Sequence, residues 1–129
     1  MRVSTRGRYA LRLMLDLAMN NTGEPVRLKD VAKRQEISEK YLEQIISILN
    51  KAGFVKSVRG PVGMILRLTE GSLAPVDCVE GGTDCGRADQ CVTVLLWKKL
   101  NDAINGVVDN ITLADLVDWQ MQKANEYVI

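Results

Sequence analysis

The chain has 129 residues, a formal net charge of +1, three cysteines and no histidine. This length suits one domain, or one domain with an extension, and 47% hydrophobic residues are enough to form a buried core. Without histidine, neither a Ser-His-Asp triad nor a cysteine nucleophile with the usual histidine base is available. No glycine-rich phosphate loop precedes a helix, so we expect a protein that is not an enzyme.

The two halves of the chain differ in charge. Residues 1–67 hold 13 Lys or Arg against 6 Asp or Glu, whereas residues 68–129 hold 4 against 10, a balance of +7 followed by −6. A basic half of this kind suits a polyanionic partner. No signal peptide or apolar run of eighteen residues occurs, so we expect a cytoplasmic protein that does not meet a membrane.

The first 53 residues predict three helices. Residues 6–20 have a broad apolar face and basic residues at their start, and Asn21 to Pro25 break the helix. A second helix is expected at 28–35, followed by a bend at 35–37. Ser38 is a plausible N-cap for a third helix whose apolar face starts at Tyr41 and which stops at Ala52-Gly53.

Two short helices joined by a tight turn predict a helix-turn-helix, with the second helix entering the major groove of DNA. The outward residues of this helix are Glu39, Lys40, Glu43 and Gln44. Gln44 has the paired donor and acceptor that can recognise an adenine edge, and Glu43 would repel phosphate unless it accepts from a cytosine amino group. A plain helical hairpin within a bundle is the alternative.

Residues 54–60 alternate as a strand that would begin the wing of a winged helix. Arg59, beside Gly60, is placed to enter a narrow minor groove or to lie near the DNA backbone. The alternative is a solvated arginine in a turn.

Three cysteines lie close together on a polar stretch that is expected to be a loop: Cys78, Cys85 and Cys91. Thiolates grouped on a loop suit an iron-sulfur cluster or another soft metal. Zinc fits less well, because its structural sites usually contain close Cys-x2-Cys pairs and four ligands. An odd number of cysteines also argues against a disulfide framework. Three unconnected thiols remain the alternative.

The C-terminal half predicts a long amphipathic helix from Val92 to Ile111, with an apolar stripe that exceeds what the small N-terminal core can cover. The expected cover is the same helix of a second subunit, packed about a two-fold axis. Thr112 and Asp115 can cap a last helix over 113–125, in which Leu116, Val117 and Trp119 are available to pack back. A monomeric six-helix domain is the alternative.

Several segments together resemble the IscR and CymR type of winged-helix repressors, over nearly the whole chain. The resemblance also includes the three cysteines followed by Leu96-Trp97. The matching segments are Arg6-Gly7-Arg8-Tyr9-Ala10-Leu11, Ile37-Ser38-Glu39-Lys40-Tyr41-Leu42-Glu43-Gln44, Val58-Arg59-Gly60-Pro61 and Leu68-Thr69-Glu70-Gly71.

The resemblance implies a mainly α homodimer with a winged helix-turn-helix over 1–67, a linker helix and cysteine loop over 68–91, and a dimerisation helix and C-terminal helix over 92–129. It implies binding to a pseudo-palindromic double-stranded DNA operator, and a cluster held by Cys78, Cys85 and Cys91, with 2Fe-2S favoured and 4Fe-4S also compatible. By matching position, the DNA contacts would be Ser38, Lys40, Tyr41, Glu43, Gln44 and Arg59, and Arg2 is a further candidate for a phosphate contact.

The chain departs from the family pattern at two places. About fifteen residues of the wing hairpin and its connection are absent after Pro61. Either the wing is truncated or the sequence omits a stretch that orders only on DNA; the second explanation is favoured because a direct connection would leave the chain no room to turn. The second departure is Val94, which stands where IscR has a histidine ligand. The three thiolates would then be completed by a carboxylate such as Asp77, Glu80, Asp84 or Asp89, by a backbone group, by a small molecule, or by nothing.

We therefore expect a dimeric transcriptional regulator, most simply a repressor, that senses iron-sulfur or redox status. The alternative is a cluster-free, CymR-like regulator of cysteine or sulfur metabolism, controlled by thiol oxidation or by a partner such as a cysteine-biosynthetic or cluster-assembly protein.

Overall fold

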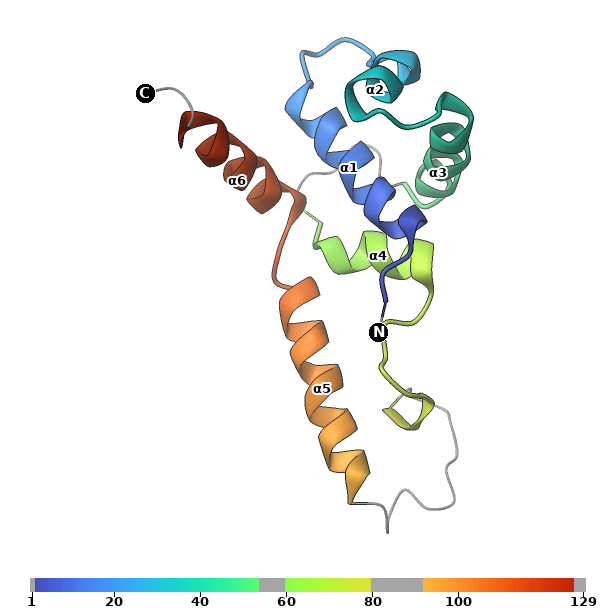
Figure 1. The fold of residues 1–129 in the computed structure, drawn as a ribbon, viewed down its shortest axis with the longest axis vertical. Helices are drawn as coiled ribbons and strands as arrows, with labels where there is room; N and C mark the ends of the chain where they lie inside the picture. The colour runs from blue at the N-terminus through green and yellow to red at the C-terminus, as the bar shows by residue number, and fades with distance from the viewer. Residues whose placement is uncertain (1, 54–59, 80–91, 127–129) are drawn as a thin grey trace.

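The computed structural model describes residues 2–53, 60–79 and 92–126, and of Cys78, Asn125 and Glu126 only the backbone. Its helices follow in the order α1 (Thr5–Met19), α2 (Leu28–Gln35), α3 (Glu39–Lys51), α4 (Val62–Glu70), a short 3-10 helix η2 (Asp77–Val79), α5 (Thr93–Val108) and α6 (Leu113–Glu126). Figure 1 shows α1 to α4 gathered into one body, α5 extending away from it, and α6 returning toward α1.

The helix-turn-helix is built by local signals. α2 ends at Gln35. Glu36, which follows it, adopts the left-handed conformation (φ 55°, ψ 45°), and the Ile37 amide donates to the Ala32 carbonyl over 3.1 Å. This bond closes the end of α2 in the manner of a Schellman turn. Ser38 then caps α3, because its hydroxyl accepts from the Tyr41 amide at 3.1 Å. The predicted bounds of α2 and the predicted N-cap are confirmed.

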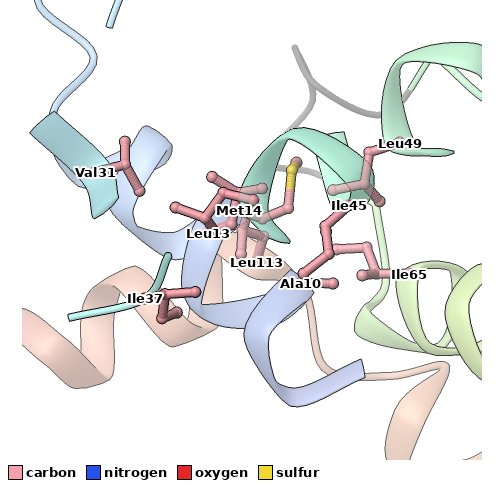
Figure 2. Packing of buried hydrophobic residues seen from close by; sticks show 10 residues of the cluster. Ala10, Leu13, Met14, Val31, Ile37, Ile45, Leu49, Ile65 and Leu113 are labelled. Atoms are coloured by element: carbon pink, nitrogen blue, oxygen red, sulfur yellow. The ribbon is translucent and has the colours of Figure 1, made fainter. Parts of the chain in front are cut away.

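The core is one cluster formed by side chains from α1, α2, α3, α4 and α6. Figure 2 shows that Leu113 and Ile65 meet the face of α1 that carries Ala10, Leu13 and Met14. The buried members are Ala10, Leu13, Met14, Val31, Ile37, Leu42, Ile45, Leu49, Ile65 and Leu113.

Leu113 is 1% exposed although it lies in the last helix. It is carried into the core by a short antiparallel pairing, in which the Val62 amide donates to the Ile111 carbonyl (2.7 Å) and the Leu113 amide donates to the Gly60 carbonyl (3.3 Å). The start of α6 is therefore part of the N-terminal core. The expected boundary after residue 67 also falls inside α4.

The connection after Pro61 corrects one argument from the sequence. Pro61 pairs with Thr112 and is at the same time the N-cap of α4, which begins at Val62. Proline suits this place because its missing amide is not needed at a helix start. The chain thus has room to pass directly from an extended pairing into a helix, and the steric case for an omitted stretch was wrong. Of the expected strand at 54–60, residues 54–59 lie outside the described residues.

α6 begins with the predicted reciprocal cap. The Thr112 amide donates to the Asp115 carboxylate at 2.8 Å, and the Asp115 amide donates to the Thr112 hydroxyl at 3.1 Å. Leu116 packs against the core as expected. Trp119 does not pack back, since it is 52% exposed. Within the described ranges, no helix is both long and apolar enough to cross a membrane.

Candidate nucleic-acid interface

The two faces of α3 have different surroundings. Leu42, Ile45 and Leu49 are fully buried in the core, so the opposite face of the helix is fixed toward solvent. Four of the residues predicted to contact DNA are exposed on or just before α3: Ser38, Lys40, Glu43 and Gln44. This arrangement presents a short polar surface on a rigid helix, as major-groove recognition requires.

Tyr41 differs from these four residues. Its side chain is partly buried and packs against the core, and its ring meets the Tyr9 ring edge-on, with centroids 5.8 Å apart and an interplanar angle of 82°. The ring therefore serves packing between α1 and α3.

Arg2 lies three residues before the first residue of α1, away from the residues of α3 in sequence, and is exposed. It lines a hollow of about 180 Å³ together with Val3, Glu70 and residues 72–74. Arg2 is thus available to a phosphate, with an acidic neighbour in the same hollow. Arg59 lies outside the described residues.

A hydrogen-bonded network joins α1 to α2 behind this surface. Asp16 is 5% exposed and accepts from Arg34 Nη2 (2.6 Å), Arg34 Nε (3.1 Å) and Gln35 Nε2 (2.9 Å). Burial acts to raise the pKa of Asp16, but these donors outweigh it and the pKa lies below its ordinary value. Sequence reasoning missed this network; the available signal was an acidic residue between Leu15 and Leu17 on an apolar face.

Glu70 makes a second connection, between α4 and the start of α1. Its carboxylate accepts from the Ser4 amide (3.1 Å) and from the Ser4 hydroxyl, and these bonds hold the pKa of Glu70 below its ordinary value. Gly7 permits the approach, because a Cβ at that position would collide with the carboxylate. The Arg6-Gly7 and Glu70-Gly71 motifs thus belong to one structural contact.

The cysteine segment is described only at its two ends. Cys85 and Cys91 lie outside the described residues, and the backbone of Cys78 lies in η2, which packs beside α5. Val94, where the resembling family has a histidine, is 6% exposed and apolar, so it supplies no ligand. Asp77 is exposed in η2; the other candidate carboxylates, at positions 80, 84 and 89, lie outside the described residues.

α5 is attached to the body by a polar clamp. Arg67 of α4 donates to Asp109 through Nη1 (2.5 Å) and Nη2 (3.1 Å), and also through Nη2 to Asn105 Oδ1 (2.8 Å). Gly63 lets the two helices approach, since a Cβ there would lie 2.5 Å from Asp109 Oδ1. The hydrogen bonds to Asp109 raise the pKa of Arg67 and lower that of the carboxylate.

The predicted apolar stripe of α5 is divided by this attachment. Ile104 and Val108 are half-buried on the side of the clamp. Five apolar side chains on α5 or directly before it are exposed, with exposed fractions from 41% to 78%: Val92, Leu95, Leu96, Leu100 and Val107. An unpaired apolar row of this extent on one helix is typical of a protein interface.

A helix-turn-helix with an exposed polar recognition surface, on a body with a protruding apolar helix, defines a DNA-binding protein of the transcription-regulator class. Residues 3–119 match the model of the Rrf2 family, described as an iron-dependent transcriptional regulator. The chain belongs to this family. Its relatives are named as regulators of transcription, and the protein is not an enzyme.

Individual relatives agree with this assignment. The HTH-type transcriptional regulator IscR of Escherichia coli O1:K1 / APEC is 40% identical over 134 residues, covering 93% of this chain and 82% of the relative. Among solved structures, CymR, the global cysteine regulator of B. subtilis, has a TM-score of 0.71 at 35% identity, covering 92% of this chain and 97% of CymR. IscR of T. potens has a TM-score of 0.67 at 39% identity, covering 92% of this chain and 87% of the T. potens chain. The winged-helix fold and the IscR/CymR resemblance are confirmed.

Proposed function

We propose that this protein is a dimeric, sequence-specific DNA-binding repressor that senses iron-sulfur or redox status through Cys78, Cys85 and Cys91. The observation that carries DNA recognition is the exposed polar face of α3, fixed in place by the Ser38 cap and by three fully buried residues on its other side. The family's description as iron-dependent supports the choice of signal.

The proposed DNA contacts divide into two kinds. Gln44 and Glu43 would contact base edges, Gln44 at an adenine and Glu43 at a cytosine amino group. Ser38, Lys40, the Tyr41 hydroxyl, Arg59 and Arg2 would position the protein on the phosphate backbone, which contributes affinity but no direct sequence information.

The solvent-facing apolar row of α5 supports the proposal of a homodimer. Two copies of this helix packed about a two-fold axis would bury Leu95, Leu96 and Leu100 of both subunits. The two copies of α3 would then meet a pseudo-palindromic operator with half-sites one helical turn apart.

The donor set suits an iron-sulfur cluster, because three thiolates are soft ligands and the chain offers no histidine. When bound, the cluster would respond to iron, oxidants or nitric oxide by loss or conversion. Val94 stands in place of a histidine, and a weak or exchangeable fourth ligand would make the site labile. Cys91 is two residues before Thr93, where α5 begins, so ligation could fix the first turn of the dimer helix and bias the spacing of the two recognition helices.

The test is an absorbance spectrum with iron and sulfide assays on protein purified without oxygen, compared with a Cys85→Ala variant, followed by DNA binding of both. We expect visible bands in the wild type that are absent in the variant, together with altered DNA binding. Equal binding of every DNA site by the apo and loaded forms would contradict cluster control.

A second candidate is a cluster-free regulator whose thiols respond to oxidation or whose binding depends on a partner protein. It is supported by the likeness to CymR, which is described as a cysteine regulator. A colourless protein that cannot be reconstituted with iron and sulfide but still binds DNA would favour this candidate.

A further inference from the structure

Two side chains of α1, Tyr9 and Arg12, contact the helix-turn-helix, and neither is among the proposed DNA contacts. Tyr9 packs against the core cluster and offers its ring to Tyr41 of α3 in an edge-to-face contact. Such pairs contribute about 0.5–1.5 kcal/mol beyond the burial of their area. Tyr41 lies between Lys40 and Glu43 in sequence, so this contact acts on the first turns of the recognition helix.

Arg12 makes the second contact, one turn further along α1. Its guanidinium lies over the Tyr9 ring, 5.2 Å from the centroid. Its Nε donates to Gln35 Oε1 at 3.0 Å, and its Nη2 donates to the Gln35 backbone carbonyl. Gln35 is the last residue of α2, where carbonyls lack intrahelical partners and a cation is favoured.

Arg12 and Tyr9 therefore touch both ends of the turn between α2 and α3. Arg12 holds the end of α2, Tyr9 holds the start of α3, and the two side chains stack on one another. The side-chain amide nitrogen of Gln35 donates to the Asp16 carboxylate at 2.9 Å, which holds in place the Gln35 oxygens that accept from Arg12. The Arg12 guanidinium contacts both Tyr9 and Gln35 although the side chain is exposed.

We propose that Arg12 and Tyr9 are positioning residues for the recognition helix: the stacked pair sets the orientation of α3 and thereby determines how well its side chains discriminate among DNA sequences. A difference of about 1 Å in the placement of α3 would misalign bidentate bonds to base edges, whereas contacts to the phosphate backbone tolerate it.

The test uses full-length Arg12→Lys, Tyr9→Leu and Tyr9→Phe, with Arg8→Lys as the matched control. Arg8 is another exposed arginine of α1, and it donates to Thr5 Oγ1, one turn away in the same helix (3.1 Å). The probe is a duplex that the wild-type protein selects from a random DNA pool, with a scrambled duplex as the non-specific reference. Each affinity is measured over a range of salt, at temperatures where thermal unfolding curves show that the variant is folded.

Arg12→Lys keeps the charge but cannot stack and bridge the two Gln35 oxygens as the planar guanidinium does. We expect the ratio of selected to scrambled affinity to fall about tenfold in Arg12→Lys and Tyr9→Leu, the size of one lost base contact. The salt dependence should be unchanged. Tyr9→Phe, which keeps the ring, and Arg8→Lys should retain the wild-type ratio.

A double-mutant cycle with Gln44→Ala separates positioning from a simple loss of stability. If Arg12 acts through α3, the losses of discrimination from Arg12→Lys and Gln44→Ala will be less than additive. A lowered melting temperature with an unchanged ratio in the folded variant would overturn the inference and leave Arg12 and Tyr9 as stabilising residues only.

The inference rests on the proposed sequence-specific function, and the two can fail separately. If the wild-type protein selects no sequence, both are overturned. If it does select a sequence and the ratio is the same in Arg12→Lys and Tyr9→Leu, only the positioning role is overturned.

Discussion

Asp16 is the one carboxylate that is buried within the parts of the chain that the structure describes. A carboxylate in this position is stable only because Arg34, Gln35 and Asn20 donate to it. We expect Asp16→Asn to lower the free energy of unfolding by about 1–3 kcal/mol, since bonds to a charged group are lost while Arg34 stays partly solvated. Urea denaturation at neutral pH measures the change.

The pH dependence of this loss has a definite sign. The pKa of Asp16 is depressed in the folded protein, so its contribution is present above its ordinary value of 3.8 and is lost as the pH falls through the lower native pKa. The stability difference between the wild type and Asp16→Asn should therefore be constant above about pH 5 and shrink at lower pH. A difference that grew on acidification would contradict the assignment.

Glu70 of α4 is a second carboxylate that stabilises α1, at the opposite end of that helix from Asp16. Replacing it by Ala removes the acceptor for the Ser4 amide and hydroxyl and the negative charge beside the helix N-terminus. We expect a loss of about 1 kcal/mol, as for other helix caps. Denaturation of Glu70→Ala beside Glu24→Ala, an exposed glutamate in the loop before α2, would show whether the loss is specific to the cap.

At the scale of the element, α3 and the segment before α1 are expected to contribute to DNA binding in different ways. Gln44→Ala should reduce discrimination among DNA sites by about 1–3 kcal/mol, because a bidentate base contact is lost. Arg2→Ala should weaken all DNA binding alike and reduce the salt slope by about one unit, as for one lost phosphate contact. Binding isotherms on matched and scrambled duplexes at several salt concentrations distinguish a loss of discrimination from a uniform loss of affinity. A uniform loss in Gln44→Ala and a loss of discrimination in Arg2→Ala would mean that α3 does not bind DNA in the proposed orientation.

At the scale of the whole molecule, the apolar row of α5 predicts the assembly. Leu96 is 55% exposed, and Leu96→Glu would place a charge in the interface expected between two copies of this helix. We expect the variant to be monomeric at concentrations where the wild type is a dimer and to lose most of its affinity for a palindromic site. Lys98→Glu, on another face of α5, is the matched control.

Sedimentation or light scattering on these variants gives the outcome directly. A wild type that is monomeric at all accessible concentrations, or a Leu96→Glu variant that remains dimeric while folded, would show that this row of α5 has another use.

The alignment with IscR also indicates how long the wing of this protein is. The match to IscR extends over 134 positions, yet 93% of this chain is only about 120 residues, so about 14 positions of the alignment have no residue here. This difference is close to the shortening expected after Pro61. A direct passage from Pro61 into α4 is compatible with a shorter wing.

The sequence by itself determined the local structure. The bounds of α2, the Ser38 cap and the Thr112–Asp115 capping box depend on residues within one or two turns of each other, and such signals are visible in a linear chain. The motifs around α1 and α3 also sufficed for the family, whereas the roles of Arg2, Gln44 and the three cysteines stay predictions.

Only the tertiary structure decided the rest. Leu113 belongs to the N-terminal core because of a pairing between residues about fifty positions apart, and Trp119 faces solvent because α6 reaches the core only through its first turns. Asp16, Glu70 and Arg12 bond to Arg34, Ser4 and Gln35, which are 18, 66 and 23 residues away in the chain. Sequence patterns show which face of a helix is apolar, but not which helix meets that face, because that choice depends on the packing of the whole chain.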